Sequence, residues 1–229
     1  MPDHTQSEDR TIFACLPAGS SRNHYRFIWS GVEEGLRVVE LPPAREFLPS
    51  IDSSLRKTAD LIASSTGSSG RATIFGHSLG GSLALAMATF LDQLHGISSQ
   101  VILSAVPSPN RGVNNPYDAS RLINRSIASF LSNESEIPRA FFELIERFVE
   151  DDFKAAVHMS EVGFASIDRV VGFISGDDDS LCNADDIDWW RKASPSLKIC
   201  SFEGGHFGYM DPKIATVYRQ FIDSLSQAL

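Results

Sequence analysis

The chain has 229 residues, 42% of them hydrophobic and 21% charged, which is ordinary for one globular domain with a large core. Its 20 basic and 29 acidic residues give a formal charge of −9, which argues against nucleic acid as the main partner. No apolar run is long enough to span a membrane, and residues 1–10 lack the apolar core of a signal peptide, so we expect a cytoplasmic protein.

Apolar runs alternate with helical patterns along the chain. After a polar tail over 1–10, buried strands are predicted at 11–16, 37–41, 72–75, 101–106, 170–175 and 197–202. Helices are expected at 24–29, at 52–65 with Asp52 as its N-cap, from about 79 to 94, at 185–192 and at 212–225. Near-continuous apolar strands separated by helices predict a mostly parallel sheet covered on both faces. Ligand chemistry then belongs at the carboxyl ends of the strands.

The alternation breaks between residues 107 and 169. Residues 107–117 are typical of a loop, whereas 118–130 and 139–158 have helical patterns. The second helix carries an apolar stripe, which consists of Phe141, Leu144, Ile145, Phe148, Val149 and Phe153. We expect the stripe to pack and the insertion to lie over the site as a lid. The chain is therefore divided into a flexible tail, 1–10, and one domain, 11–229, with a lid over 107–169.

The segment Gly76-His77-Ser78-Leu79-Gly80 has the G-x-S-x-G pattern of a nucleophile elbow. A serine at a sharp strand-to-helix turn has crowded neighbours, and glycines at both ends remove the side chains that would collide. A predicted strand precedes the pattern and a long helix follows it, which is the context the elbow requires. We therefore expect Ser78 to be the nucleophile.

A serine nucleophile needs a general base, and the base needs an acid that orients it. In proteins with such an elbow the chain order is serine, acid, histidine. We therefore expect the acid after the fifth strand, where Asp177, Asp178 and Asp179 are the candidates. The pattern G-x-x-D after Gly176 favours Asp179, with Asp177 second. His206 alone among six histidines follows the last strand, and we expect it to be the base; the others are His4, His24, His77, His95 and His158.

An oxyanion hole needs two N–H donors. The first is expected from Leu79, directly after the nucleophile, and the second from the small residues after the first strand, with Ala18 favoured and Gly19 close behind. No metal or cofactor is expected. The three cysteines lack metal-ligand spacing, and we expect them to be buried thiols of a protein in a reducing compartment. Cys15 lies in the middle of a predicted strand and is not a candidate nucleophile.

Five segments together resemble the type II thioesterases, stand-alone α/β-hydrolases of nonribosomal peptide and polyketide synthase pathways. In the family's order, they are 15–19 (CLPAG), 38–46 (VVELPPARE), 75–80 (FGHSLG), 176–179 (GDDD) and 204–207 (GGHF). The family patterns are L-P-x-A-G-G, V-x-x-x-L-P-G-R-E, F-G-H-S-M-G, G-D-x-D and G-G-H-F. This chain departs from them in a first loop one residue short, and at Ser20, Ala44 and Leu79.

The resemblance implies an α/β-hydrolase fold and a monomer that hydrolyses acyl, aminoacyl or peptidyl thioesters on the phosphopantetheine arm of carrier domains, for proofreading or release. The phosphopantetheine would belong to the carrier, and the enzyme itself would need no cofactor. A small-molecule carboxylesterase or lipase with the same triad remains an alternative, because the triad does not fix the substrate. A non-enzymatic binding protein is disfavoured by an intact set of Ser78, Asp179 and His206.

Overall fold

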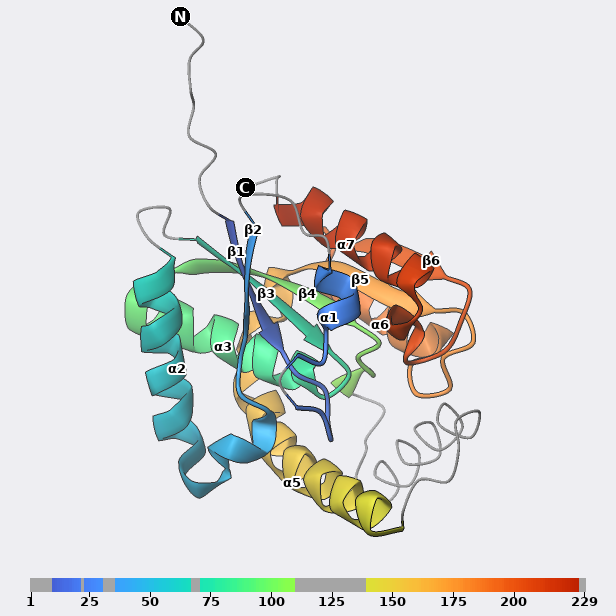
Figure 1. Cartoon of the computed structure of the whole chain (residues 1–229). Coiled ribbons are helices and arrows are strands. Elements are labelled where there is room, and N and C mark those ends of the chain that lie inside the picture. Colours follow the sequence, from blue (N-terminus) through green and yellow to red (C-terminus); the bar gives the residue numbers. More distant parts are fainter. Residues whose placement is uncertain (1–9, 22, 31–35, 67–70, 110–138, 227–229) are drawn as a thin grey trace, which may run out of the picture.

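The computed structural model describes residues 10–21, 23–30, 36–66, 71–109 and 139–226, except the side chains of 139–142 and 145. Its sheet has the strand order β2-β1-β3-β4-β5-β6 (Figure 1), and every neighbouring pair is parallel. The strands are β1 (Arg10–Cys15), β2 (Leu36–Glu40), β3 (Arg71–His77), β4 (Ser98–Ser104), β5 (Val170–Gly176) and β6 (Lys198–Phe202). The predicted parallel α/β sheet is confirmed.

Helices cover both faces of this sheet (Figure 1). On one face lie α1 (Arg26–Trp29) and α7 (Pro212–Ser226), with the short η5 (Gly208–Met210). The other face is packed by α2 (Ile51–Ser65), α3 (Gly80–His95), α5 (Arg139–Gly163) and α6 (Ala184–Ala193). Two 3₁₀ segments, η1 (Ala44–Ser50) and η4 (Phe164–Arg169), flank α2 and α5. Where the described residues test them, the predicted helices are confirmed.

Several boundaries differ from expectation. Asp52 is not an N-cap: η1 runs directly into α2, which begins at Ile51, so Asp52 lies in its first turn. The strand β4 begins at Ser98, because its polar first residues pair with β3 although they carry no hydrophobic signal. The expected helix at 139–158 continues to Gly163, packed along α3. The expected helix at 118–130 lies outside the described residues, as do 1–9 of the tail. Arg10, expected in the tail, is instead the first residue of β1 because it pairs with Leu36 of β2.

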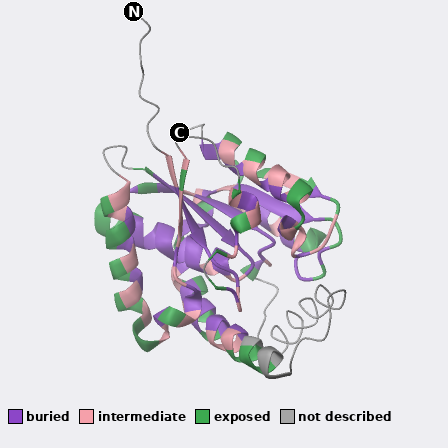
Figure 2. Cartoon of the chain, in the orientation of Figure 1, coloured by how far each residue is buried: buried purple, intermediate pink, exposed green. Residues whose placement is uncertain are grey.

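The core lies on both sides of the sheet (Figure 2). Alternate residues of β1 show why: Phe13 and Cys15 pack towards α2 and α3, whereas Ile12 and Ala14 pack towards α1 and α7. A period of two along a strand buried on both faces gives the continuous apolar run seen in the sequence. No helix in the described ranges is long and apolar enough to cross a membrane.

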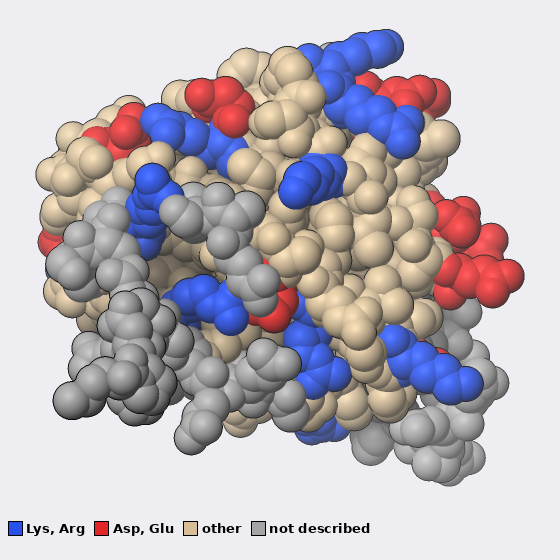
Figure 3. Space-filling model, turned by 90° about the horizontal axis from the view of Figure 1, so that it is seen from above, with Lys and Arg blue, Asp and Glu red and all other residues tan. Residues whose placement is uncertain are grey.

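Three strands of the sheet begin with a basic residue. Strands β1, β3 and β6 begin with Arg10, Arg71 and Lys198, and Figure 3 shows lysine and arginine side chains spread over the end of the molecule from which β1 starts. At the other end, β1 and β3 lie side by side although β2 comes between them in sequence. Loops leaving such neighbours diverge to opposite faces and open a crevice at their carboxyl ends.

Candidate active site

Ser78 occupies the turn between β3 and α3 and has a left-handed backbone, with φ of 53°. A Cβ at Gly76 would lie 2.5 Å from the carbonyl oxygen of Gly80, and a Cβ at Gly80 would collide with the carbonyl oxygen of Cys15. The expected reason for both glycines is therefore confirmed. The strained serine is held by its N–H, which donates to the Ser104 carbonyl at 2.8 Å.

The loops after β5 and β6 bring an acid and a base together. Asp179 Oδ2 lies 2.8 Å from His206 Nδ1, and both side chains are almost fully buried. A carboxylate only accepts, so Nδ1 carries the proton and Nε2 remains as the basic nitrogen. The N–H groups of Leu181 and Cys182 donate to Asp179 Oδ1 at 2.8 and 3.1 Å. Both carboxylate oxygens are thus engaged, which fixes the orientation of the imidazole.

Asp177 and Asp178, the competing aspartates, are exposed, and they contribute their backbone to this arrangement. Their N–H groups donate to the carbonyls of Phe202 and Gly204 at 2.9 and 3.0 Å. The two loops touch so closely that a Cβ at Gly176 would collide with the Gly204 carbonyl. Of the three aspartates, the structure brings only Asp179 to the histidine.

The remaining described histidines have other surroundings. His77 is fully buried, with its ring centroid 4.7 Å from that of His206 and its Nδ1 2.9 Å from Ser104 Oγ. Burial, and then the neighbouring His206 and His24, lower the pKa of His77 well below its usual value. His95 and His158 pair with aspartates at the surface, and His4 lies outside the described residues.

The loop after β1 supplies the second candidate donor. Ala18 and Leu79 both pack against the cluster that Val149 and Leu181 form, so the two expected donor residues lie at one small cluster. The Gly19 N–H donates instead to Asp152 Oδ2 at 2.8 Å. Since Gly19 is occupied in this way, Ala18 is the better candidate of the two.

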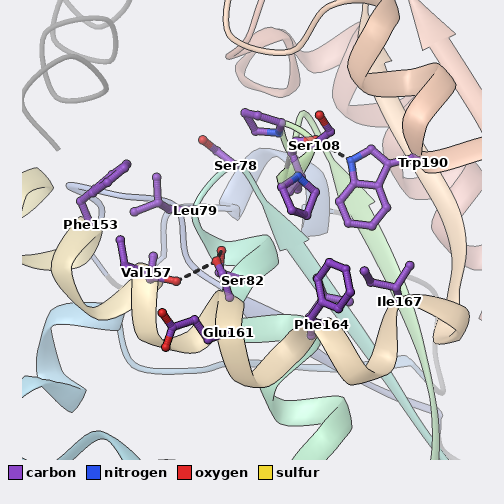
Figure 4. A pocket seen from close by; sticks show the side chains of 16 residues that line it. Ser78, Leu79, Ser82, Ser108, Phe153, Val157, Glu161, Phe164, Ile167 and Trp190 are labelled. Atoms are coloured by element: carbon purple, nitrogen blue, oxygen red, sulfur yellow. Dashed lines mark hydrogen bonds between the residues drawn. The ribbon is translucent and has the colours of Figure 1, made fainter. Parts of the chain in front are cut away.

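A pocket of about 420 Å³ opens beside Ser78 (Figure 4). Its walls come from the start of α3, the loop after β4, the second half of α5, η4 and α6. Figure 4 shows Leu79 next to Ser78, with Phe164, Ile167 and Trp190 farther along the pocket. Most lining side chains are apolar, and Ser160 and Ser82, hydrogen-bonded at 2.8 Å, add a polar patch. Such walls suit a hydrocarbon group attached to a carbonyl at Ser78.

Sequence reasoning missed two residues at this site, Asp152 and Arg45. The Arg45 Nη1 donates to Asp152 Oδ2 at 2.7 Å, and this ion pair lies between α5 and the loop after β1. A signal was present: Asp152 follows Val149 by three residues and precedes Phe153, so it falls on the apolar stripe of the helix. A carboxylate on the packed face of a helix needs partners.

The thioesterase domain family matches residues 10–224 of this chain. Thioesterase PikA5 of Streptomyces venezuelae is 28% identical over 149 residues, which cover 60% of this chain and 51% of PikA5. The match therefore spans about half the length of that curated relative.

Two solved structures share the fold over nearly the whole chain. The RedJ thioesterase from the prodiginine biosynthetic pathway of Streptomyces coelicolor has a TM-score of 0.67 at 15% identity, covering 96% of this chain and 91% of RedJ. A putative lipase from Acinetobacter baumannii has a TM-score of 0.66 at 15% identity, covering 96% and 86%. At such identity the likeness concerns the fold alone. The family match extends over nearly all of the described elements, and the chain belongs to the thioesterase domain family.

Proposed function

We propose that this chain is a stand-alone serine thioesterase that hydrolyses acyl, aminoacyl or peptidyl thioesters from the phosphopantetheine arm of carrier domains in a natural-product synthase. One observation carries the proposal: a strained Ser78 at the end of β3 is accompanied, in the predicted chain order, by the buried Asp179–His206 pair. Membership of the thioesterase domain family and the five family-like segments favour a thioester over an oxygen ester.

The proposed mechanism has two halves. His206 Nε2 takes the proton of Ser78 Oγ as the oxygen attacks the thioester carbonyl, while Asp179 holds the imidazole and stabilises the imidazolium. The N–H groups of Leu79 and Ala18 bind the oxyanion, each contributing about 3 kcal/mol to transition-state stabilisation. The thiol leaves with the proton from His206. Water, activated by His206, then hydrolyses the acyl-enzyme and frees the acid.

The pocket supports an acyl substrate. It begins at Ser78 and Leu79 and continues between α5 and the loop after β4, where apolar walls exclude water from the chain of the acyl group. The carrier arm would enter from the open side of the pocket. We propose that the protein acts as a monomer. Its domain comprises residues 11–229, and residues 107–169 form the lid. All three cysteines are thiols, which supports a reducing compartment, the cytoplasm.

The test is intact-protein mass spectrometry of carrier domains loaded with acetyl, branched short-chain, longer acyl and aminoacyl groups. Wild type should remove the acyl mass and Ser78→Ala should not. Broad removal of short chains would favour proofreading over release. Nitrophenyl esters provide the competing substrates: cleavage of these while every carrier load persists would replace the proposal by the esterase or lipase alternative.

A second measurement separates an enzyme from a binding protein on a hydrolase fold. A fluorophosphonate should label wild type at Ser78, because the probe needs an activated serine. Asp177→Asn, which alters an exposed neighbour of the proposed acid, should be labelled at the wild-type rate, whereas Ser78→Ala should not be labelled. An unlabelled wild type would exclude serine catalysis.

A further inference from the structure

Helix α5 carries a buried carboxylate that faces the loops of the site. The side chain of Asp152 is 1% exposed. Its Oδ2 accepts a hydrogen bond from the Gly19 N–H at 2.8 Å, and its Oδ1 accepts one from the Arg45 N–H at 2.7 Å. One carboxylate on the lid helix thus holds two segments that lie more than a hundred residues away in sequence.

The guanidinium of Arg45 completes this arrangement. Its Nη1 donates to Asp152 Oδ2 and its Nη2 to the Ser20 carbonyl, both at 2.7 Å. Its carbon atom Cζ lies 4.3 Å from the centre of the Phe148 ring, one turn before Asp152 on α5. The loop after β1, η1 and α5 are therefore joined by a single ion pair with its hydrogen bonds.

Stability alone is a weak reason for such a pair. Burial raises the pKa of Asp152 above its usual value, although the N–H groups of Gly19 and Arg45 and the charge of Arg45 favour the carboxylate. A buried ion pair is often no better for stability than well-packed apolar side chains. What the pair adds is geometric specificity, because each N–H donor must be aligned with one acceptor oxygen.

Direction matters most at the candidate oxyanion loop. Gly19 has φ of 71°, and its hydrogen bond to Asp152 fixes the peptide plane that follows Ala18. The Ala18 side chain packs against the cluster that Val149 and Leu181 form, and Val149 lies one turn before Asp152 on α5. Both the peptide and the side chain next to the Ala18 N–H are therefore held by α5.

We propose that Asp152 is a positioning residue that aims the Ala18 N–H at the oxyanion, so that the oxyanion hole is complete only while α5 lies against the loop after β1. Asp152 acts through Gly19 and Arg45 rather than on the reacting atoms. This inference rests on the proposed function, since it presupposes attack by Ser78.

The first test compares kcat and KM of Asp152→Asn on an acyl-pantetheine thioester. Asparagine keeps the size of the side chain but has one acceptor oxygen in place of two and no charge. We expect kcat to fall about 10- to 100-fold, somewhat less than for loss of a whole oxyanion donor, with KM changed less than about twofold. Asp151→Asn is the matched control: its carboxylate is 45% exposed and pairs with Lys154, so kcat should stay at the wild-type value.

The second test uses two inhibitors that differ in whether they form an oxyanion. An alkyl trifluoromethyl ketone adds to the serine and places an oxyanion in the hole, whereas the matching thioether has no carbonyl. In Asp152→Asn the ketone affinity should fall by about the same factor as kcat, and the thioether affinity should stay the same. A merely structural role for Asp152 would lower thermal stability without separating the two inhibitors.

Should Asp152→Asn fail to fold, Asp152→Glu and Arg45→Lys keep the charges while moving the hydrogen bonds, and the same separation is expected of them. Unchanged kcat in a folded variant, or equal loss of both inhibitors, would overturn the inference while an active wild type leaves the proposed function standing. A wild type that cleaves no thioester would overturn the proposed function, and this inference with it.

Discussion

Two largely buried polar networks lie on the α5 side and the α7 side of the candidate triad, and they differ in charge. On the side of α5, the Asp152–Arg45 ion pair binds the N–H of Gly19 and the carbonyl of Ser20. On the side of α7 the groups are neutral: Tyr218 OH lies 2.8 Å from Ser104 Oγ, Ser104 Oγ lies 2.9 Å from His77 Nδ1, and His24 Nε2 lies 2.5 Å from Tyr209 OH.

The difference follows from what each network joins. The charged one connects the loop after β1, the 3₁₀ segment η1 and helix α5, which share no strand pairing that would fix their relative positions. The neutral one connects β3, β4 and α7, which the sheet and the core already hold, and its His24–Tyr209 bond joins the turn before α1 to η5 within the same core cluster. It also lies next to His206, where a positive charge on His77 would oppose the imidazolium of the proposed mechanism. The ion pair therefore lies where directional hydrogen bonds must hold separate segments together, and the neutral groups lie where a charge would disfavour protonation of the proposed base.

The largest expected effect comes from Asp179→Asn, which alters the pair that both networks flank. Asparagine can still accept from the N–H groups of Leu181 and Cys182, but it no longer holds His206 in the required tautomer. We expect kcat to fall about 10³- to 10⁴-fold with little change in thermal stability, measured with an acyl-pantetheine thioester. Asp177→Asn is the control and should retain activity; the reverse pattern would move the acid to Asp177.

His24→Gln tests whether the neutral network has to stay neutral. Burial, and then the charge of Arg26, lower the pKa of His24 from 6.5 to about 4. Between pH 6.5 and about pH 4 the unfolded chain binds more protons at His24 than the native chain does. The contribution of neutral His24 to the free energy of unfolding is therefore complete above pH 6.5 and is lost as the pH falls to about 4. His24 alone should account for about 3 kcal/mol of that loss in the free energy of unfolding, about 2 kcal/mol of it by pH 5.

Urea unfolding of wild type and His24→Gln at pH 7 and pH 5 measures this difference, and equal losses in both proteins would refute it. Asp152→Asn supplies the comparison with the charged network. The raised pKa of Asp152 means that the native state binds the extra proton, so its contribution to stability falls as the pH rises above 3.8. The two networks should therefore depend on pH with opposite signs.

The segments of the candidate site could be predicted from the sequence because each is local. The glycines around Ser78, and Gly176 before the turn of Asp179, are required by close approaches of the backbone at strand ends, and strand ends follow from apolar runs. Gly204, before His206, has a positive φ of 147°. Asp179 could be ranked above Asp177 only by pattern; the reason for it, two N–H donors from the following residues, is visible in the structure.

The Asp152–Arg45 pair could not be predicted with the same ease, because its partners are 107 residues apart and its geometry depends on how α5 packs. The choice between Ala18 and Gly19 depends on the same packing, since it is the Asp152 carboxylate that occupies the Gly19 N–H. The misplaced cap at Asp52 has a local cause: η1 supplies the turn that precedes α2, so no side-chain cap is needed there.

The smallest expected effect, Tyr218→Phe, decides whether the contrast between the networks is real. The substitution removes one buried hydrogen bond to Ser104 and keeps the ring that packs against Phe202 and Tyr209. We expect the free energy of unfolding to fall by about 1 kcal/mol and kcat to stay within about twofold of wild type. Asp152→Asn should show the opposite balance, a large change in kcat for its change in stability. If Tyr218→Phe instead lowered kcat tenfold at unchanged stability, the neutral network would also position catalytic groups. Removal of a hydrogen bond that only supports the fold should lower the free energy of unfolding and leave kcat unchanged.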